Sequence, residues 1–491
     1  MNRNKGSGVV IAWVAAISIA ISFFLIRSQS IRLDEAQSIW TSSKSVKELL
    51  QLTANDVHVP LYGLLLHLVM QVFGNDILVA RMLSLFFYVL TIPFLYRLAR
   101  ESSDRWVAVL TVTLFSFSPF IVWYSGEARM YTLFSLSVSV NQLFFLRLIR
   151  SRGKHGKLGY FIGTLTGLYT HYFFIFVLVS QALYVFFHNL TKENGVGLSK
   201  KFKLTWLGIS GLSFSLFVPW VYFMVKSGLG EGMRPLLTTP SSYSIVQTFT
   251  NFLFGFQEEE VQNLFISLWP LSTALLFLIF TEKNKKKTRN IDYFFLVTFL
   301  PVLLVFVISY IQPIFLSRYL ILVTPTLFFL LAWTIGNYQR RVSLILAELV
   351  IALMVGMTMY QYFSNKTPVK ESYRELSSYL SESVEPSDVV AISAPFTIYP
   401  IEYNYEGQAR LVTIPEWNRY LENSNIPEYK DDDLAGMMSK FREKYKKMYL
   451  VLSYDQGYEK DIRNYLDHNF EITEQREFPT DISLVVYKLK Y

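Results

Sequence analysis

Long runs of apolar residues alternate with short polar connections over the first three quarters of the chain. A bilayer core requires about 20 apolar residues per helix. Eleven stretches approach this length, and they predict membrane-spanning helices at about residues 9–26, 78–96, 106–123, 130–146, 158–170, 172–187, 204–225, 263–280, 291–311, 314–334 and 342–362.

The first of these stretches resembles a signal peptide, because Arg3 and Lys5 precede it. Its apolar run is longer than that of a usual signal peptide, however, and no small-residue cleavage site follows before Arg27. We therefore expect residues 9–26 to be retained as a membrane anchor.

Two predicted connections are long, at about residues 27–77 and 226–262. Within the first, Asp34–Trp40 and Ser45–Leu50 have helix-compatible patterns, and His58–Phe73 is apolar but too short to span a bilayer. These segments predict helices that lie in the membrane interface.

The C-terminal region has a different pattern. Helical periodicity over 373–383, 440–447 and 461–469 alternates with strand-like runs over 388–393, 448–452 and 482–487. This alternation predicts an α/β domain. The whole chain is therefore expected to be a polytopic α-helical membrane protein (residues 1–362) with a C-terminal extracytoplasmic α/β domain (residues 363–491).

Composition supports this division. The 491 residues are 52% hydrophobic and only 17% charged, whereas soluble proteins carry about 25% charged residues. Cysteine is absent, which excludes disulfides, thiolate metal sites and cysteine nucleophiles. Residues 363–491 have a net charge of −6, and the apolar residues 1–362 have a net charge of +14. The two together give the total of +8.

The distribution of Lys and Arg in the connections predicts the topology. Alternate connections hold 21 Lys and Arg residues, and the other set holds nine. The positive-inside rule places the richer set in the cytoplasm. We expect an integral plasma-membrane protein with a cytoplasmic N-terminus and an external C-terminal domain. The basic charge then sets topology and does not indicate nucleic-acid binding.

The scarce polar residues gather at the outward ends of the predicted helices. They occur in five short motifs and at one arginine, which are Asp34-Glu35, His58-Val59-Pro60-Leu61-Tyr62, Arg81, Glu127-Ala128-Arg129-Met130-Tyr131, Thr170-His171-Tyr172 and Ser317-Arg318-Tyr319. Each has a structural explanation too, as a helix cap, local ion pair, interfacial residue or headgroup anchor. Their shared location predicts a site at the outer membrane face.

The order of these motifs resembles the polyprenyl-phosphate-sugar-dependent membrane glycosyltransferases of the C superfamily, which include protein O-mannosyltransferases and lipid A aminoarabinose transferases. The resemblance covers residues 1–362. His58-Val59-Pro60 departs from the commoner His-Pro-Pro pattern, which concerns only the local turn. The resemblance implies inverting transfer of a sugar from a polyprenyl-phosphate donor to a lipid, glycan or protein acceptor.

These chemical requirements suggest roles for the acidic and basic residues. Asp34 is predicted to be the general base, because a desolvated carboxylate accepts a proton more readily. Glu35 and Glu127 are further catalytic candidates. Arg129, Arg318 and Arg81 are candidates for the donor phosphate, since arginine presents paired donors to phosphate.

The remaining polar residues are candidates for substrate contacts, and three residues suggest a metal. The substrate-binding candidates are His58, Tyr62, His171, Tyr172 and Tyr319. Asp34, Glu127 and His171 together also offer ligands for a divalent metal ion.

Two other function classes are compatible with a membrane protein of this kind. A transporter or flippase of lipid-linked sugars should have ionisable residues or broken helices near the bilayer midplane and often an inverted repeat. The sequence shows no such repeat. A membrane-anchored binding module would account for the C-terminal domain but not for eleven spans that share a polar rim.

Overall fold

The computed structural model describes residues 5–56, 58–150, 153–187, 198–227, 237–267, 290–364, 371–420 and 426–490. The chain forms two compact units. The first contains Met1–Arg27, His58–Phe223 and Pro235–Pro368, and the second contains Ser28–Val57, Met224–Arg234 and Val369–Tyr491. Residues 28–57, which form the first part of the predicted loop 27–77, thus group with the C-terminal region, whereas the division at residue 362 remains a prediction from sequence.

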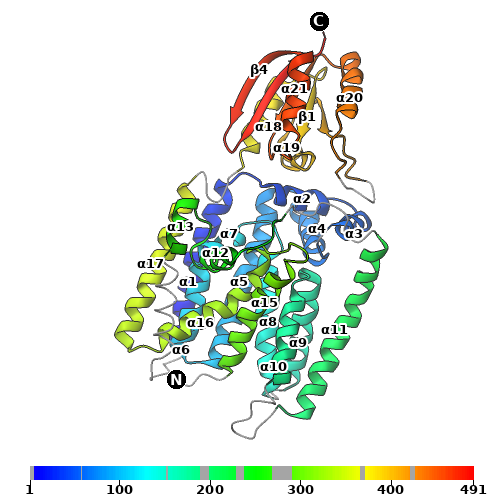
Figure 1. Ribbon diagram of the computed structural model, residues 1–491. Helices are drawn as coiled ribbons and strands as arrows, with labels where there is room; N and C mark the ends of the chain where they lie inside the picture. The colour runs from blue at the N-terminus through cyan, green and yellow to red at the C-terminus, as the bar shows by residue number, and fades with distance from the viewer. Residues whose placement is uncertain are drawn as a thin grey trace. The chain divides into compact units, whose positions relative to one another are not determined.

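The first unit is helical (Figure 1). Its elements are α1 (Lys5–Ser28), α4 (Leu61–Phe73), α5 (Ile77–Ser102), α6 (Arg105–Phe117), α7 (Pro119–Ser125), α8 (Tyr131–Ile149), α9 (Gly153–Thr170), α10 (Phe174–Phe187), α11 (Lys200–Lys226), α12 (Ser242–Phe254), α13 (Glu259–Ser267), α15 (Ile291–Ile308), η1 (Tyr319–Val323), α16 (Thr324–Gly336) and α17 (Arg340–Phe363).

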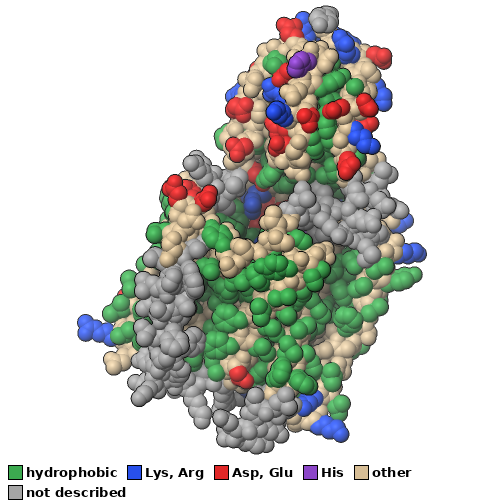
Figure 2. All heavy atoms as spheres, in the orientation of Figure 1, with side chains coloured by type: hydrophobic (Ala, Val, Ile, Leu, Met, Phe, Trp, Pro, Cys, Tyr) green, Lys and Arg blue, Asp and Glu red, His purple; other side chains and the backbone are tan. Residues whose placement is uncertain are grey.

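Among the described residues, six helices are long and apolar enough to cross a membrane, or up to eight if each of two bent helix pairs is one span. One of these pairs is α6 with α7, which are bent by 62° where Pro119 begins α7. Most of the predicted stretch 263–280 lies outside the described residues. The structure confirms a helical membrane protein, and the number eleven remains a prediction. Hydrophobic side chains dominate the visible surface of this unit (Figure 2).

Helices α8 and α9 pack at a close approach that depends on glycine. A Cβ added to Gly163 would lie 2.7 Å from the backbone nitrogen of Asn141. The side chain of Asn141 itself donates to Thr164 Oγ1 at 2.9 Å and accepts from Gln181 Nε2 at 2.6 Å. Small residues allow such backbone approach in membrane helices, and interhelical hydrogen bonds add to it.

We expect Gly163→Ala to destabilise the protein by about 1–3 kcal/mol, because backbone atoms cannot move aside as a flexible side chain can. The matched control is Gly208→Ala in α11, where an added Cβ meets nothing within 4 Å. That change should be neutral or slightly stabilising. Thermal unfolding in detergent compares the two, and equal melting temperatures would contradict the packing argument.

The second unit combines the two loop helices with an α/β domain. Its elements are α2 (Leu33–Ser42), α3 (Val46–Asn55), α18 (Tyr373–Ser383), β1 (Val389–Ser393), η2 (Pro395–Thr397), α19 (Ile398–Asn404), β2 (Arg410–Ile414), α20 (Asp431–Lys444), β3 (Lys447–Leu452), α21 (Glu459–Asn469), β4 (Glu471–Phe478) and β5 (Ile482–Lys488). The sheet order is β2-β1-β3-β5-β4, with β2, β1 and β3 parallel and β5 and β4 antiparallel to their neighbours.

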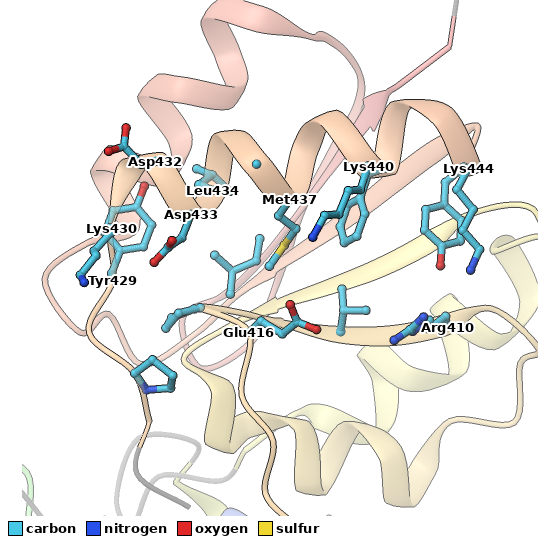
Figure 3. A pocket seen from close by; sticks show the side chains of 17 residues that line it. Arg410, Glu416, Tyr429, Lys430, Asp432, Asp433, Leu434, Met437, Lys440 and Lys444 are labelled. Atoms are coloured by element: carbon cyan, nitrogen blue, oxygen red, sulfur yellow. The ribbon is translucent and has the colours of Figure 1, made fainter.

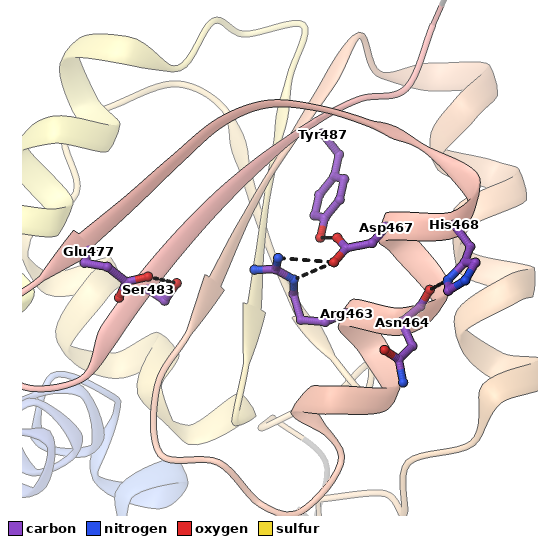
Figure 4. Close-up of polar contacts among 7 residues, drawn as sticks. All are labelled: Arg463, Asn464, Asp467, His468, Glu477, Ser483 and Tyr487. Atoms are coloured by element: carbon purple, nitrogen blue, oxygen red, sulfur yellow. Dashed lines mark hydrogen bonds and ion pairs between the residues drawn. The ribbon is translucent and has the colours of Figure 1, made fainter.

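Buried strands form the core of this domain. All five residues of β1 are buried, and apolar residues of α20 and α21 pack on the sheet beside Met448 and Leu450 of β3. On α21, Asp467 pairs with Arg463 one turn earlier and accepts a hydrogen bond from the hydroxyl of Tyr487 on β5 (Figure 4). The predicted α/β domain is therefore present, with β2 and β4 as strands that the pattern did not predict.

Candidate functional site

The predicted site residues divide between the two units. Nine belong to the first unit, where they lie in the helix-connecting turns or within the first two turns of helices: His58, Tyr62, Arg81, Glu127, Arg129, His171, Tyr172, Arg318 and Tyr319. Asp34 and Glu35 belong to the second unit and lie in the first turn of α2.

A direct contact between His58 and Arg129 forms the centre of the first group. Nη2 of Arg129 lies 2.7 Å from Nε2 of His58. The guanidinium group can only donate, so Nε2 of His58 accepts this hydrogen bond and carries no proton. His58 precedes α4 and Arg129 lies between α7 and α8, so two segments 71 residues apart build this pair.

Neighbouring side chains hold both partners of the pair through their backbones. The hydroxyl of Tyr172 donates to the carbonyl of His58 at 3.0 Å, and Nε1 of Trp220 donates to that hydroxyl at 3.2 Å. Oγ of Ser84 donates to the carbonyl of Arg129 at 3.1 Å. Tyr172 is therefore a positioning residue in this structure, and Ser84 and Trp220 are site residues that the sequence pattern did not indicate.

The hydroxyl of Tyr62 extends this network. It lies 2.9 Å from Oγ of Ser84, and both side chains are buried. Ser84 follows Arg81 by three residues on α5, so both side chains lie on the same face of this helix. This spacing is the feature of the sequence that could have indicated Ser84 as a site residue.

His171 lies beside the arginines in the turn between α9 and α10, outside both helices. Burial lowers its pKa to about 3, and the positive charges of Arg129 and Arg318 lower it further. His171 is therefore neutral at pH 7. Its Nδ1 accepts the Phe173 backbone N–H at 3.1 Å, which leaves the proton on Nε2.

Arg318 lies in the same electrostatic environment, immediately before η1. Its Cζ is 5.7 Å from the ring centre of Tyr319, whose ring in turn lies 5.2 Å from that of His171. The preceding Ser317 is 3.0 Å from Oγ1 of Thr248 on α12. The loop at 226–262 thus supplies a helix that contacts the Ser317-Arg318 turn.

Arg81 and Glu127 are buried, with 1% and 3% of their surfaces exposed. Nη1 of Arg81 donates to the carbonyl of Ile26 at 2.8 Å, which ties α5 to the end of α1. The backbone carbonyl of Glu127 accepts from the Arg129 N–H at 2.7 Å, closing the tight turn before α8. Both contacts show structural roles, and the phosphate role of Arg81 and the catalytic role of Glu127 remain predictions.

In the second unit, Glu35 is fully buried, and its Oε2 accepts the backbone N–H of Arg32 at 3.0 Å. This contact satisfies one of the free N–H groups at the start of α2. Asp34 is partly exposed on the same helical turn. The geometry therefore gives Glu35 a capping role, while the role of Asp34 as base remains a prediction.

No three His, Asp or Glu side chains are grouped as ligands of one metal ion among the residues that the structure describes. The predicted set of Asp34, Glu127 and His171 draws on both units. This set remains a prediction.

A cavity of about 640 Å³ lies in the C-terminal domain, between β2 and α20 (Figure 3). Arg410, Lys440 and Lys444 lie near one end, and Asp432 and Asp433 lie near the other. None of the predicted site residues lines this cavity. The candidate site that the structure describes is therefore the polar cluster of the first unit.

Residues 57–223 match the family model described as dolichyl-phosphate-mannose-protein mannosyltransferase. This segment contains nearly all of the polar cluster, from His58 through Arg129 to Tyr172 and Trp220. No curated protein matches the chain by sequence.

Solved structures share the fold. ArnT from Cupriavidus metallidurans in the apo state has a TM-score of 0.63 at 11% identity, covering 98% of each chain. The same protein bound to undecaprenyl phosphate has a TM-score of 0.62 at 12% identity, covering 97% of each chain. The arabinofuranosyltransferase AftD from Mycobacteria has a TM-score of 0.52 at 11% identity, covering 98% of this chain and 42% of that one.

The structural similarity extends over both units, and the family-model match falls on the segment that builds the polar cluster. These findings show that the chain has the fold of ArnT and that its segment 57–223 is similar to the dolichyl-phosphate-mannose-protein mannosyltransferase family.

Proposed function

We propose that the protein transfers a sugar from a polyprenyl-phosphate donor to a lipid, glycan or protein acceptor at the outer membrane face, with inversion at the anomeric carbon. The observation that carries this proposal is the contact between His58 and Arg129, together with the ring of Tyr319, which lies next to both Arg318 and the buried His171. Such a cluster is suited to the phosphate that departs with the lipid, since its negative charge develops during transfer.

The roles follow from the chemistry of each side chain. Asp34 accepts the proton of the attacking acceptor, while Arg129 and Arg318 stabilise the departing phosphate. Neutral His171 is able to donate from Nε2 to a phosphate or sugar oxygen. The binding of undecaprenyl phosphate by ArnT, which has the same fold, supports a lipid phosphate as the ligand of this cluster.

This function fits a specific arrangement in the membrane. We propose eleven spans with a cytoplasmic N-terminus and an external C-terminal domain, because the 21 basic residues of alternate connections should remain in the cytoplasm. The candidate residues of the turns before α8, α10 and η1 then lie on the external side.

Incubation of the purified protein with defined polyprenyl-phosphate sugars tests the function. We expect free polyprenyl phosphate and a glycosylated acceptor to form together. Release of neither with any donor, combined with movement of the donor between the leaflets of proteoliposomes, would support a flippase instead.

Replacement of Arg318 by alanine should weaken use of the donor by about 10- to 100-fold, because one charge-assisted contact to the phosphate is lost. Membrane insertion should be unaffected. The matched control is Arg97→Ala, an exposed arginine on α5. Donor titrations of both variants provide the measurement, and an unchanged donor affinity in Arg318→Ala would exclude the phosphate role.

A further inference from the structure

Helix α2 carries the proposed base Asp34, yet it is held by residues of the C-terminal domain more than 300 positions later in the chain. Both parts belong to the second unit. Ala36 and Ile39 of α2 are buried, and the helix packs on α19 of the domain. Specific contacts fix each end of the helix.

Glu371 caps the N-terminal end of α2. Residue Arg32 occupies the N-cap position, where Ser, Thr, Asp or Asn would normally accept a backbone N–H, and an arginine side chain is unable to do so. Oε2 of Glu371 instead accepts the backbone N–H of Leu33 at 2.7 Å, and its Oε1 accepts the hydroxyl of Tyr454 at 2.7 Å. A carboxylate also interacts favourably with the helix dipole at this end.

Trp40 fixes the other end of α2. Its ring lies 5.2 Å from that of Tyr399 and 5.3 Å from that of Tyr420, and Cζ of Arg419 lies 4.6 Å from its centre. Arg419 is 7% exposed and forms an ion pair with Glu402 of α19. Tilted and edge-to-face aromatic pairs of this kind are favourable geometries, and the cation–π contact is strengthened because Arg419 is buried.

We propose that the C-terminal domain positions the base for transfer by clamping α2 at both ends, through Glu371 at its start and the Arg419–Tyr399–Tyr420 cluster around Trp40 at its end. The inference rests on the proposed function, in which Asp34 is the base. Asp34 directly follows Leu33, whose N–H is bound by Glu371, so loss of that contact displaces the turn that carries the base. A misplacement of about 1 Å at a reacting group costs up to about 10²-fold in rate.

Glutamine is the conservative replacement for Glu371. Burial raises the pKa of Glu371 above its ordinary 4.5, and the charge of Asp34 adds to this effect. The charge of Arg32 and the hydrogen bonds from Tyr454 and Leu33 lower the pKa, but they do not cancel the effect of burial. The folded state therefore binds this proton more tightly than the unfolded chain, and stability falls as pH rises from 4.5 through the raised pKa. Glutamine keeps an oxygen that accepts the Leu33 N–H and has no carboxylate charge to bury. Alanine removes the hydrogen bond to Leu33 altogether.

Spin labels measure the position of the α2–α3 segment relative to the C-terminal domain independently of catalysis. The chain has no cysteine, so Lys47→Cys on α3 and Glu443→Cys on α20, both exposed, introduce the only two labelling sites. We expect a narrow distance distribution in the otherwise unchanged protein and in Glu371→Gln, and a broadened one in Glu371→Ala and Arg419→Ala. Glu471→Gln, at an exposed ion pair of the same domain, is the control and should leave the distribution unchanged.

Transfer kinetics then connect position to function. We expect kcat to fall about 10- to 100-fold in Glu371→Ala with little change in KM for the donor, and to be largely restored in Glu371→Gln. An unchanged distance distribution in both disruptive variants would overturn the clamp. A broadened distribution with unchanged kcat would overturn its role in positioning the base. If the unmodified protein transfers no sugar, the proposed function fails, while the label distances still decide whether the clamp exists.

Discussion

Replacing Asp34 with asparagine should reduce transfer by about 10²- to 10⁴-fold, the range over which a positioned general base contributes to catalysis. Asparagine has the same shape as aspartate, and the side chain of Asp34 is partly exposed on the first turn of α2. The fold should therefore survive the change. The measurement is the rate of sugar transfer at saturating donor and acceptor.

The same loop supplies the control for this prediction. Glu48 is an exposed residue of α3, where its side chain accepts from the backbone N–H of Ser45 at 3.1 Å. Glu48→Gln removes a negative charge from the loop without altering the turn of α2 and should retain full activity. A normally inserted Asp34→Asn protein that transfers sugar as fast as Glu48→Gln would eliminate Asp34 as the base.

The membrane helices were predictable because bilayer physics leaves a strong and local signal. Every backbone group must be satisfied within the lipid, so an apolar run of sufficient length must form a helix. The stretches at 78–96 and 342–362 correspond to α5 and α17. The bend between α6 and α7 depends on Pro119 within a continuous apolar run, and a hydropathy pattern does not distinguish it from a straight span.

The strands were less predictable because their signal depends on their neighbours. Buried β1 and β3 appear as continuous apolar runs. The residues of β4 up to Glu477 are all exposed, with sequence EITEQRE, so no apolar face marks them as a strand. These residues form a strand only because they pair with β5, and a local sequence pattern does not indicate which segment a strand pairs with.

The candidate site follows the same division between local and tertiary information. The rarity of charge in an apolar sequence identified His58, Arg129 and His171, which the structure brings together. It did not identify Ser84 or Trp220, whose types are common in membrane helices and whose role comes only from their partners. Neither did it identify Glu371, which caps a helix 338 residues away.

The contact between His58 and Arg129 gives the second large expected effect. Arg129→Ala should reduce transfer by about 10²- to 10³-fold, as removal of a preorganised donor to a developing oxyanion does in other enzymes. The effect should exceed that of Arg318→Ala, because the 2.7 Å contact fixes the guanidinium of Arg129 in one orientation. Arg129→Lys retains the charge but loses the paired planar donors, so it should recover only part of the activity.

A double-mutant cycle separates the positioning of Arg129 from its charge. If His58 acts by orienting Arg129, His58→Ala should reduce kcat in the presence of Arg129 and have little further effect in Arg129→Ala. Additive losses would instead mean that His58 contacts the substrate independently. An Arg129→Ala protein that folds, inserts and transfers sugar at the unmodified rate would remove the phosphate-binding cluster from the mechanism, because Arg129 is the residue that contacts both His58 and Ser84.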